Sequence, residues 1–423
     1  MHLETTLAPT LEPTPLADFL SGVLKRLRPL PALDLDLTQA FGNVLAEDVR
    51  ASTPLPAFDH AADDGYAARW EDVIGAAPLR PVRLNVVGDV SAASWRPVRV
   101  APGTCFSIAA GAPLPAAANV VIPPGVTDQG MAAVEVREQP KRGRGVRRAG
   151  DEIKAGTVIA PAGSYVTPAV VAVLAATGVG HVVVRPSPRV SVIATGDELV
   201  DAGRASQPGQ VVDANSHALA AGAAEAGAYA YRIGICDDDP EALRGVLEDQ
   251  ISRSDLIVTT GGTSTGPGDM VRRILGRDGS VRFTEVSLFP CTMVGYGTLS
   301  SGPTRGEEVP VICLPGDPGA ALVGFEVLVR PVIQKLAGAE PVFRPSVRAH
   351  LLDTLNSPIG MREFRPAYVS ERRGGGYTAQ PLPGGPYTLS GMAAANGLIV
   401  LGERVKTCPA GSTVDVLMLE RRR

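Results

Sequence analysis

Two glycine-bearing turns hold the residues of this sequence that are best suited to bind a charged small molecule. Each turn directly follows a short apolar, β-branched run, at 190–195 and at 255–260. Glycine lets the backbone approach a ligand closely, the N–H groups of such turns suit phosphate oxygens, and carboxylates beside a phosphate usually hold a cation such as Mg2+. We therefore predict a site for a phosphorylated small molecule, formed by Gly196 and Glu198 of the first turn and by Gly261, Gly262, Ser264 and Asp269 of the second.

A third acidic segment, Asp237-Asp238-Asp239-Pro240, places carboxylates just before a predicted helix. Asp239 suits the N-cap, because proline favours the first helical position and aspartate the position before it. Asp238 is then left free for chemistry. Helix capping is also the simpler interpretation of the acids after Gly196, but two such turns on one sheet favour a site.

A proline-bracketed loop follows another predicted strand, in the run Cys313-Leu-Pro315-Gly-Asp317-Pro318. The Asp317-Pro318 pair has the form of a helix start, and the N–H groups there would favour an anion. An ordinary strand-to-helix turn explains the same residues. This segment alone does not decide between the two interpretations.

Two further acids, Asp59 and Asp64, lie in the segment 56–69. A solvated acidic turn accounts for them as well as a binding role does. Downstream, the basic and glycine-broken run 141–148 indicates either a solvated hinge between modules or an anion site, and its charge alone favours the hinge.

The elements that would position the two turns form an α/β unit over residues 188–338. Short β-branched strands separated by helical stretches indicate neighbouring strands of a parallel sheet, where ligands lie off the carboxyl ends of the strands. An amphipathic helix is expected over 15–28. Short strands with Pro/Gly turns are expected over about 45–185, and a small all-β domain after Pro341.

Composition argues against several classes of function. With 4% aromatic residues, a net charge of −4 and a pI near 5.8, the chain offers no nucleic acid its usual stacking surfaces or positive charge. The sequence has neither a Walker A motif nor a Gly-x-Gly-x-x-Gly after a strand, so ATP hydrolysis and dinucleotide binding lose their usual support. His60, His181 and His217 lack the spacing of metal ligands.

Five scattered cysteines without a Cys-x-x-Cys pair fit a reduced cytoplasm. The first residues lack the basic-then-apolar order of a signal peptide, and the apolar stretches 169–186 and 320–336 are interrupted by Gly, Pro or charged residues. We expect a cytoplasmic protein without direct membrane insertion.

Taken in order, these segments resemble the molybdopterin molybdenumtransferase family, which includes the E domain of gephyrin. The resemblance covers nearly the whole chain. Its landmarks are the segments 58–59, 64–67, 111–115, 147–151, 195–199, 213–215, 238–240, 261–269 and 314–318. No single landmark is decisive, but the ordered set is highly specific.

The resemblance implies a four-domain chain of mixed α/β and β structure. Residues 1–55 and 147–187 would form an elongated mixed domain, and 56–146 a β-rich insertion. Residues 188–338 would form a three-layer α/β molybdopterin-binding domain, and 339–423 a C-terminal β-barrel. The family also implies an elongated homodimer whose cleft receives residues of both subunits.

The activity that the resemblance implies is insertion of molybdenum from molybdate into adenylylated molybdopterin, with Mg2+ and with release of AMP. At matching positions, Glu198, Asp238 and Asp269 would be catalytic carboxylates, with Glu198 and Asp269 as metal ligands. The substrate-binding residues implied in the same way are Asp59, Asp64, Gly196, Gly261, Gly262, Ser264, Pro315, Pro318 and Arg362. A cation would screen the phosphates while fixed donors orient the reactants.

The chain departs from the family where positive charge is expected. The family's Lys-Pro-Gly-Lys-Pro loop corresponds to Phe289-Pro-Cys-Thr-Met293, so both lysines are lost, and the asparagine of Pro-Gly-Asn-Pro is Asp317. Loss of cations beside a polyanion weakens its binding. Arginines at 272, 273 and 282 are candidates to compensate.

Two other functions therefore stay open. A paralogue without catalysis would serve as a dimeric, gephyrin-like scaffold that binds a peptide of a partner protein. Alternatively, an enzyme of this fold would act on a related phosphorylated pterin or nucleotide without molybdate. The fold alone does not decide among these functions.

Overall fold

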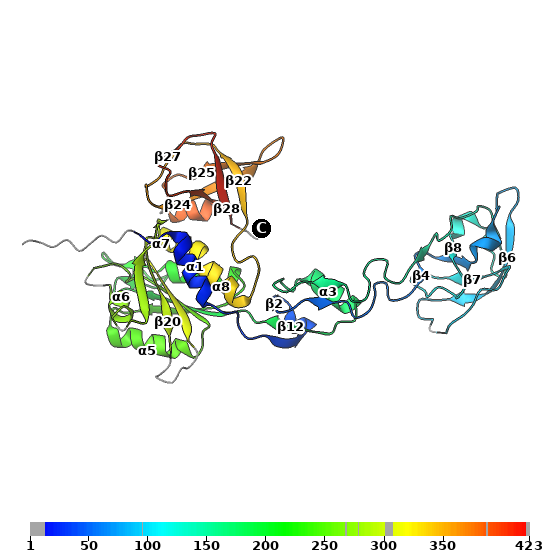
Figure 1. Cartoon of the computed structure of the whole chain (residues 1–423), viewed down its shortest axis with the longest axis horizontal. Coiled ribbons are helices and arrows are strands. Elements are labelled where there is room, and N and C mark those ends of the chain that lie inside the picture. Colours follow the sequence, from blue (N-terminus) through cyan, green and yellow to red (C-terminus); the bar gives the residue numbers. More distant parts are fainter. Residues whose placement is uncertain are drawn as a thin grey trace, which may run out of the picture.

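The computed structural model describes residues 13–94, 96–266, 269–277, 279–300, 308–385 and 388–419. The molecule is elongated, with an α/β body and a barrel at one end and a separate β-rich module at the other (Figure 1). A narrow mixed region connects the two ends. The predicted combination of α/β and β domains in one chain is confirmed.

A six-stranded sheet forms the centre of the body. Its strands lie in the order β16 (Tyr229–Cys236), β13 (Arg189–Thr195), β17 (Leu256–Thr260), β21 (Val309–Leu314), β20 (Met293–Leu299) and β18 (Val281–Glu285). The first four strands are parallel, and β20 is antiparallel to both of its neighbours. The prediction that the runs before the two glycine turns are neighbouring parallel strands is confirmed by the pairing of β13 with β17.

Helices cover both faces of this sheet, in line with the near-continuous apolar strands. They are α4 (Asn215–Glu225), α5 (Pro240–Ile251), α6 (Met270–Leu275), α7 (Pro318–Gly324) and α8 (Arg330–Ala337), with a π-helical turn at Phe325–Val329. Two helix starts are as predicted: the Asp239 carboxylate accepts the N–H of Ala242 at 2.8 Å, and that of Asp317 accepts the N–H of Ala320 at 2.8 Å.

The predicted N-terminal helix exists as α1 (Leu16–Arg26) and belongs to the core of the body. Leu16 and Val23 are buried in the same apolar cluster as Val332 and Ile333 of α8. The sequence grouped residues 1–55 with the elongated domain, whereas the structure packs this helix against α8. The apolar face of an amphipathic helix needs a matching surface, and α8 supplies it.

The narrow region combines strands from before and after the distal module. Strand β12 (His181–Arg185) lies between β1 (Leu33–Asp36) and β2 (Val44–Leu45), and β11 (Val158–Ala160) pairs with β3 (Val49–Arg50). Helices α2 (Leu37–Ala40) and α3 (Pro168–Ala176) complete it. Apolar side chains of both chain segments share one small core here.

The distal module is a five-stranded sheet in the order β8 (Val120–Ile122), β5 (Gly65–Ala68), β7 (Thr104–Ile108), β6 (Val82–Val90) and β9 (Ala133–Val136). Two short 3-10 turns, Trp70–Val73 and Pro124–Val126, flank it. The chain enters through β4 (His60–Ala61) and leaves through β10 (Val146–Arg147), and these two strands pair antiparallel. The end of the basic run 141–148 thus lies at the connection, where a hinge was favoured.

The C-terminal strands close into a five-stranded barrel, as predicted. The order is β24 (Arg362–Glu371), β25 (Tyr377–Pro381), β22 (Ser346–Leu351), β28 (Thr413–Met418) and β26 (Gly397–Leu401), and β26 pairs back to β24. Helix α9 (Leu389–Ala394) and the pair β23 (Leu355–Asn356) with β27 (Thr407–Cys408) complete the domain.

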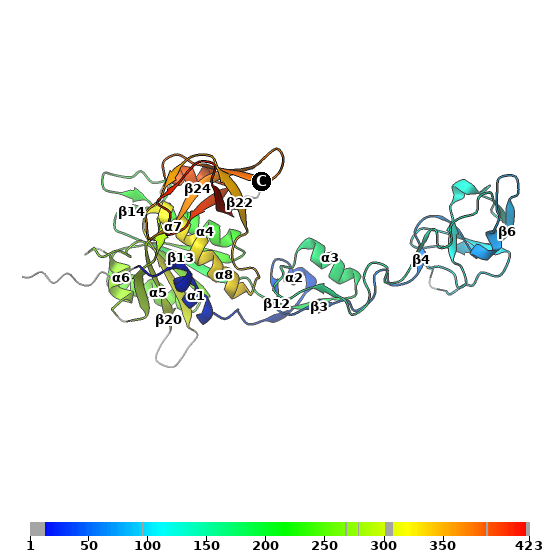
Figure 2. The ribbon, with the colours of Figure 1, turned by 45° about the horizontal axis from the view of Figure 1, so that its top comes forward.

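The barrel is attached to the body on the side of α7 and α4 (Figure 2). Strand β19 (Leu288–Phe289), which belongs to the body segment, pairs in parallel with β24. Phe364, Met392 and Leu398 of the barrel domain join the apolar cluster of the body. Over the described residues, no helix combines the length and the apolar character that crossing a bilayer requires.

Candidate functional site

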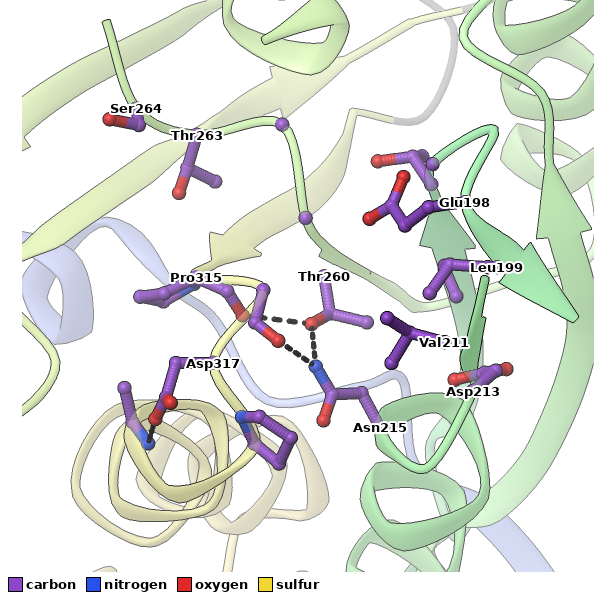
Figure 3. Close-up of a pocket in the computed structure, with 18 of the residues that line it drawn as sticks. Glu198, Leu199, Val211, Asp213, Asn215, Thr260, Thr263, Ser264, Pro315 and Asp317 are labelled. Atoms are coloured by element: carbon purple, nitrogen blue, oxygen red, sulfur yellow. Dashed lines mark hydrogen bonds between the residues drawn. The ribbon is translucent and has the colours of Figure 1, made fainter. Parts of the chain in front are cut away.

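A cavity of about 730 Å3 lies at the carboxyl ends of β13, β17 and β21. This is where a parallel sheet is expected to bind a ligand. Its lining includes nine residues of the predicted site: Gly196, Glu198, Asp238, Gly261, Gly262, Ser264, Asp269, Pro315 and Pro318. The two glycine turns, the triple-aspartate segment and the proline loop, which are distant in sequence, therefore meet around one space. Figure 3 shows Glu198 and Ser264 of the two turns and Pro315 of the proline loop around it.

Close backbone packing requires the glycine at position 261, whereas Gly196 leaves room for a neighbouring side chain. Gly261 has a φ of +97°, and a Cβ atom there would lie 2.5 Å from the carbonyl oxygen of Thr195, at the end of the neighbouring strand. At Gly196, with a φ of +151°, a Cβ atom would meet the Glu198 carboxylate at 2.5 Å. The Glu198 side chain thus folds back over Gly196, and the missing side chains keep this part of the cavity open.

The acids at the cavity repel one another. The pKa of Asp238 is raised, first by burial and then by the negative charges of Asp197, Glu198 and Asp269. The Asp238 N–H also donates to Asp197 Oδ1 at 2.9 Å, which ties the two acidic turns together. Within the described part of the chain, no Arg, Lys or His forms an ion pair with Glu198, Asp238 or Asp269. These carboxylates therefore form a negative rim that no cation among the described residues neutralises.

Asp269 also has a structural contact. Its Oδ1 accepts the N–H of Ser264 at 2.9 Å, and a Cβ atom at Gly266 would lie 2.7 Å from Oδ2. The Asp269 carboxylate therefore stabilises the conformation of the second glycine turn. The sequence indicated only the role of a ligand for Asp269.

The acids fit a divalent cation only as a partial site. Among the described residues, no three His, Cys, Asp or Glu side chains form a metal-binding group of their own. Mg2+ is typically held by one or two carboxylates together with water and substrate phosphates. Glu198 and Asp269, which line the same cavity, match that kind of shared site.

Asn215, at the start of α4, is a lining residue for which the sequence predicted no contact. Its Nδ2 donates to Thr260 Oγ1 at 2.8 Å and to the carbonyl oxygen of Gly316 at 2.9 Å, while Thr260 Oγ1 donates to the carbonyl oxygen of Pro315 at 2.9 Å (Figure 3). These bonds fix the proline loop to the end of β17. Its membership of the 213–215 landmark was the only signal in the sequence.

A small flap borders the same side of the cavity. The short strands β14 (Leu199–Val200) and β15 (Val211–Val212) pair in parallel. Leu199 of the first strand and both valines of the second line the cavity. Below the flap, the buried Asp213 accepts the N–H of Ser216 at 2.9 Å and pairs with Arg232 at 3.2 Å. Asp213 is therefore used to hold the flap, which the sequence did not predict.

At the proline loop, Asp317 corresponds by the resemblance to an asparagine of the family. Its carboxylate caps α7, and both Asp and Asn are good N-cap residues. The helix start is kept, while a negative charge is added at the cavity wall.

The segment that corresponds to the family's lysine loop does reach the cavity. Pro290, Thr292 and Met293 are among the lining residues, and Phe289 belongs to β19 beside the barrel. By the resemblance to the family, Phe289 and Thr292 correspond to its two lysines. The structure shows a hydroxyl, a thioether and a proline ring on this wall.

Asp59 and Asp64 do not line the cavity of their own chain. Asp59 Oδ2 accepts from Arg148 Nη1 at 2.6 Å, and its Oδ1 accepts the N–H of Ala149 at 2.8 Å. Asp64 Oδ1 accepts the N–H of Ala110 at 2.7 Å. Asp59 directly precedes β4 and Asp64 directly precedes β5. The distal module that these strands belong to lies at the opposite end of the molecule from the body (Figure 1).

Arg362 also stays outside the cavity lining. It begins β24, its guanidinium pairs with Glu403 at 3.1 Å, and its backbone N–H donates to the carbonyl oxygen of Ser287 at 3.0 Å. It therefore lies where the barrel meets the segment that leads into Phe289.

Comparisons with known proteins agree with this organisation. Residues 14–178 match the MoeA N-terminal region (domain I and II), 191–335 a probable molybdopterin binding domain, and 348–419 the MoeA C-terminal region (domain IV). Two crystal structures of molybdopterin biosynthesis MoeA proteins from Pyrococcus horikoshii superpose with TM-scores of 0.81 and 0.79. They are 28% and 25% identical in sequence and cover 97% and 96% of this chain and 100% of their own.

Sequence relatives extend over almost the same length. Molybdopterin molybdenumtransferase 2 of Mycobacterium tuberculosis is 37% identical over 400 residues, which cover 93% of this chain and 96% of the relative. Molybdopterin molybdenumtransferase 1 of the same organism is 36% identical over 403 residues, with coverages of 90% and 93%. With this identity over both full lengths, and with the cavity formed by the family's landmark turns, the chain belongs to the molybdopterin molybdenumtransferase family of molybdenum cofactor biosynthesis enzymes.

Proposed function

We propose that this protein inserts molybdenum from molybdate into adenylylated molybdopterin and releases AMP, with Mg2+ bound together with the substrate. The observation that carries the proposal is the meeting of nine predicted residues around one cavity whose acids lack a cationic partner among the described residues. Such a cavity suits a phosphorylated ligand that arrives with its own divalent cation.

The proposed roles follow from the positions around the cavity. Glu198 and Asp269 hold Mg2+, and Asp238 adds negative charge that favours its binding. The cation neutralises the phosphates of the substrate and the developing charge on AMP. Gly261 and Gly262 leave room for the ligand's close approach, and Pro315 and Pro318 form the facing wall.

The active form in this proposal is a cytoplasmic homodimer. The distal module, which contains Asp59 and Asp64, is too far from the body to reach the cavity of its own chain (Figure 1). In the proposed elongated dimer, the distal module of one subunit would lie beside the cavity of the other. All five cysteines are free and buried, which fits a reducing compartment. Light scattering of the purified protein should give twice the mass of 43.9 kDa, and a monomer at micromolar concentration would contradict this part.

The test of the reaction is AMP release from adenylylated molybdopterin in the presence of molybdate and Mg2+, measured by chromatography. Wild-type protein should turn over, and removal of Mg2+ should stop it. Asp269→Asn, which keeps an oxygen for the N–H of Ser264, should lose about a hundredfold in rate while staying folded and dimeric. If wild type releases no AMP where a lysine-bearing relative does, the proposal fails.

One observation favours a second function, a dimeric scaffold that binds a peptide of a partner protein. The wall formed by Pro290, Thr292 and Met293 has lost the lysines that the family uses, which would suit a protein released from catalysis. In that case the full-length dimer would bind a partner peptide saturably and release no AMP. Turnover at rates typical of the family would remove this alternative.

A further inference from the structure

Among the described residues, the cavity lining includes several carboxylates and no Lys or Arg, so a bound anion needs a cation from the residues just outside the lining. Arg272 of α6 meets the requirement. Its Nη1 lies 3.5 Å from the carbonyl oxygen of Ser264 and 3.6 Å from Met293 Sδ. Ser264 and Met293 both line the cavity, and Met293 belongs to the very segment that replaces the lysine loop.

The position of Arg272 is fixed by its surroundings. Its backbone N–H donates to the carbonyl oxygen of Gly262 at 3.0 Å, which anchors α6 to the second glycine turn. Its guanidinium lies 6.0 Å from the centre of the Phe283 ring. A half-buried arginine held over an aromatic ring has lost part of its hydration and is pre-positioned for an anion.

The charge of Arg272 is available for a ligand. Its guanidinium contacts a carbonyl oxygen, a thioether and an aromatic ring, and no described Asp or Glu forms an ion pair with it. Arg362, which begins β24 beside this wall, is already paired with Glu403. A guanidinium offers five N–H donors and matches the oxygens of tetrahedral anions well.

We propose that Arg272 binds a tetrahedral oxyanion at the edge of the cavity between Ser264 and Met293, in place of the two lost lysines. This inference rests on the proposed function for the identity of the anion, which is either molybdate or the phosphate of adenylylated molybdopterin. It makes Arg272 a binding residue that sets the affinity of the site for one of the two substrates.

The experiment compares wild type with Arg272→Met, Arg272→Lys and the control Arg282→Met. Methionine keeps an unbranched apolar side chain over Phe283 without the charge. Lysine keeps the charge but lacks the planar, paired N–H donors of the guanidinium. Arg282, another of the arginines that the sequence offered as a replacement cation, is exposed on β18, the edge strand of the same sheet, and does not line the cavity. Binding of molybdate and of inorganic phosphate is measured by calorimetry at fixed ionic strength, and thermal melts verify that each variant is folded.

We expect Arg272→Met to raise the Kd of at least one anion by about ten- to a hundredfold, because one charge-assisted contact is lost. Arg272→Lys should recover part of the affinity, and Arg282→Met should bind as wild type does. In steady state, a raised KM for molybdate identifies molybdate as the anion, and a raised KM for adenylylated molybdopterin identifies its phosphate.

The inference is overturned if wild type binds neither anion saturably, or if Arg272→Met keeps both affinities and both KM values. Should Arg272→Met fail to fold, the partial loss in Arg272→Lys against an unchanged Arg282→Met decides in the same way. The outcome is separable from that of the proposed function. Arginine-dependent anion binding without AMP release would contradict the reaction alone, and AMP release that is indifferent to Arg272 would contradict this inference alone.

Discussion

The pKa values of two aspartates at the two ends of the molecule are shifted in opposite directions. At the cavity, burial and neighbouring carboxylates raise the pKa of Asp238. At the distal module, the N–H of Ala149 and the guanidinium of Arg148 lower the pKa of Asp59 despite an opposing effect of burial. The first carboxylate is destabilised in its charged form by the fold, and the second is stabilised.

Within the part of the chain that the structure describes, the carboxylates at the cavity lack a compensating positive charge, whereas the carboxylate at the distal module already has one. A cluster of acids without a protein cation gains from a bound metal, so its cost to the fold is repaid only on binding. Asp59 instead joins the loop at Arg148 to the segment that leads into β4, so its charge is already compensated within its own subunit. Residue type alone did not distinguish the two cases.

The strongest test of the comparison is Glu198→Gln set against Asp64→Asn. Glu198→Gln should lower AMP release at least about a hundredfold, because a cation ligand is lost inside the subunit's own cavity. Asp64→Asn keeps an oxygen for the N–H of Ala110, so the module should stay folded. In an isolated subunit this change would be silent, and in the proposed dimer it would impair the partner's cavity.

Mixing the two variants decides between these outcomes. If each cavity takes Asp64 from the partner, half of the dimers would be mixed and half of their cavities intact, which restores about a quarter of the wild-type rate. If the mixture releases AMP no faster than the two parent variants do, Asp64 does not contribute to the partner's cavity and serves only the structure of its own module.

The next largest effect is expected for the glycines. Gly261→Ala combines a φ of +97° with a contact to the Thr195 carbonyl oxygen, and should lower the free energy of unfolding by ~3 kcal/mol. Gly103 in the distal module has a φ of +73° but open space around its missing Cβ, so Gly103→Ala should cost only ~1 kcal/mol. Urea titrations of both variants measure this. Equal losses would mean that the cavity turn is no more constrained than a surface turn.

A smaller effect is expected for Asp59→Asn. The folded pKa is lowered, so the charged form adds stability above the ordinary pKa near 3.8, and that stability disappears as the pH falls through the folded value. Because the pair with Arg148 is largely exposed, the loss at pH 7 should be at most about 1 kcal/mol. Unfolding curves of the two proteins should converge only when the pH falls below the lowered pKa of Asp59, which lies under 3.8. A difference that persisted in acid would point to lost packing.

The smallest effect has the opposite sign. The folded pKa of Asp238 is raised, so its charge costs stability at neutral pH, and this cost is relieved as the pH falls through the raised pKa. Asp238→Asn should therefore raise the Tm slightly at pH 7 without Mg2+ while it impairs turnover. Saturating Mg2+ should shrink or reverse the gain. A lower Tm for the variant at pH 7 without metal would contradict the repulsion between the acids.

Local sequence signals predicted most of the body and of the barrel. The β-branched runs at 190–195 and 255–260 became adjacent parallel strands because such runs, between helices, have few other ways to be buried. The two Asp-Pro pairs marked helix starts because they combine a side-chain cap with a residue that needs no N–H bond. The nine converging residues follow from these elements, since parallel strands bring their following turns to one edge.

Contacts between distant segments were beyond the sequence. Nothing local indicates that Asn215 binds the proline loop, because this contact depends on how separate elements pack. Arg272 was one of three candidate cations in the sequence, and only the packing of α6 shows that it reaches Met293. The place of α1 was missed for the same reason: its apolar face predicts burial, and the surface that buries it lies more than three hundred residues away on α8.

The paired strands β4 and β10 give the distal module the character of a cassette. The chain leaves and returns side by side, with His60 opposite Arg147 and Leu55 bridged to Ile153. Residues between them could be removed or exchanged with a short turn in their place, because closing such a short gap requires little loop entropy. A chain without the cassette should keep its cavity and its barrel while losing any contribution of the module to a second subunit. Evolution and engineering can therefore change the length and contacts of the distal module without changing the residues of the cavity.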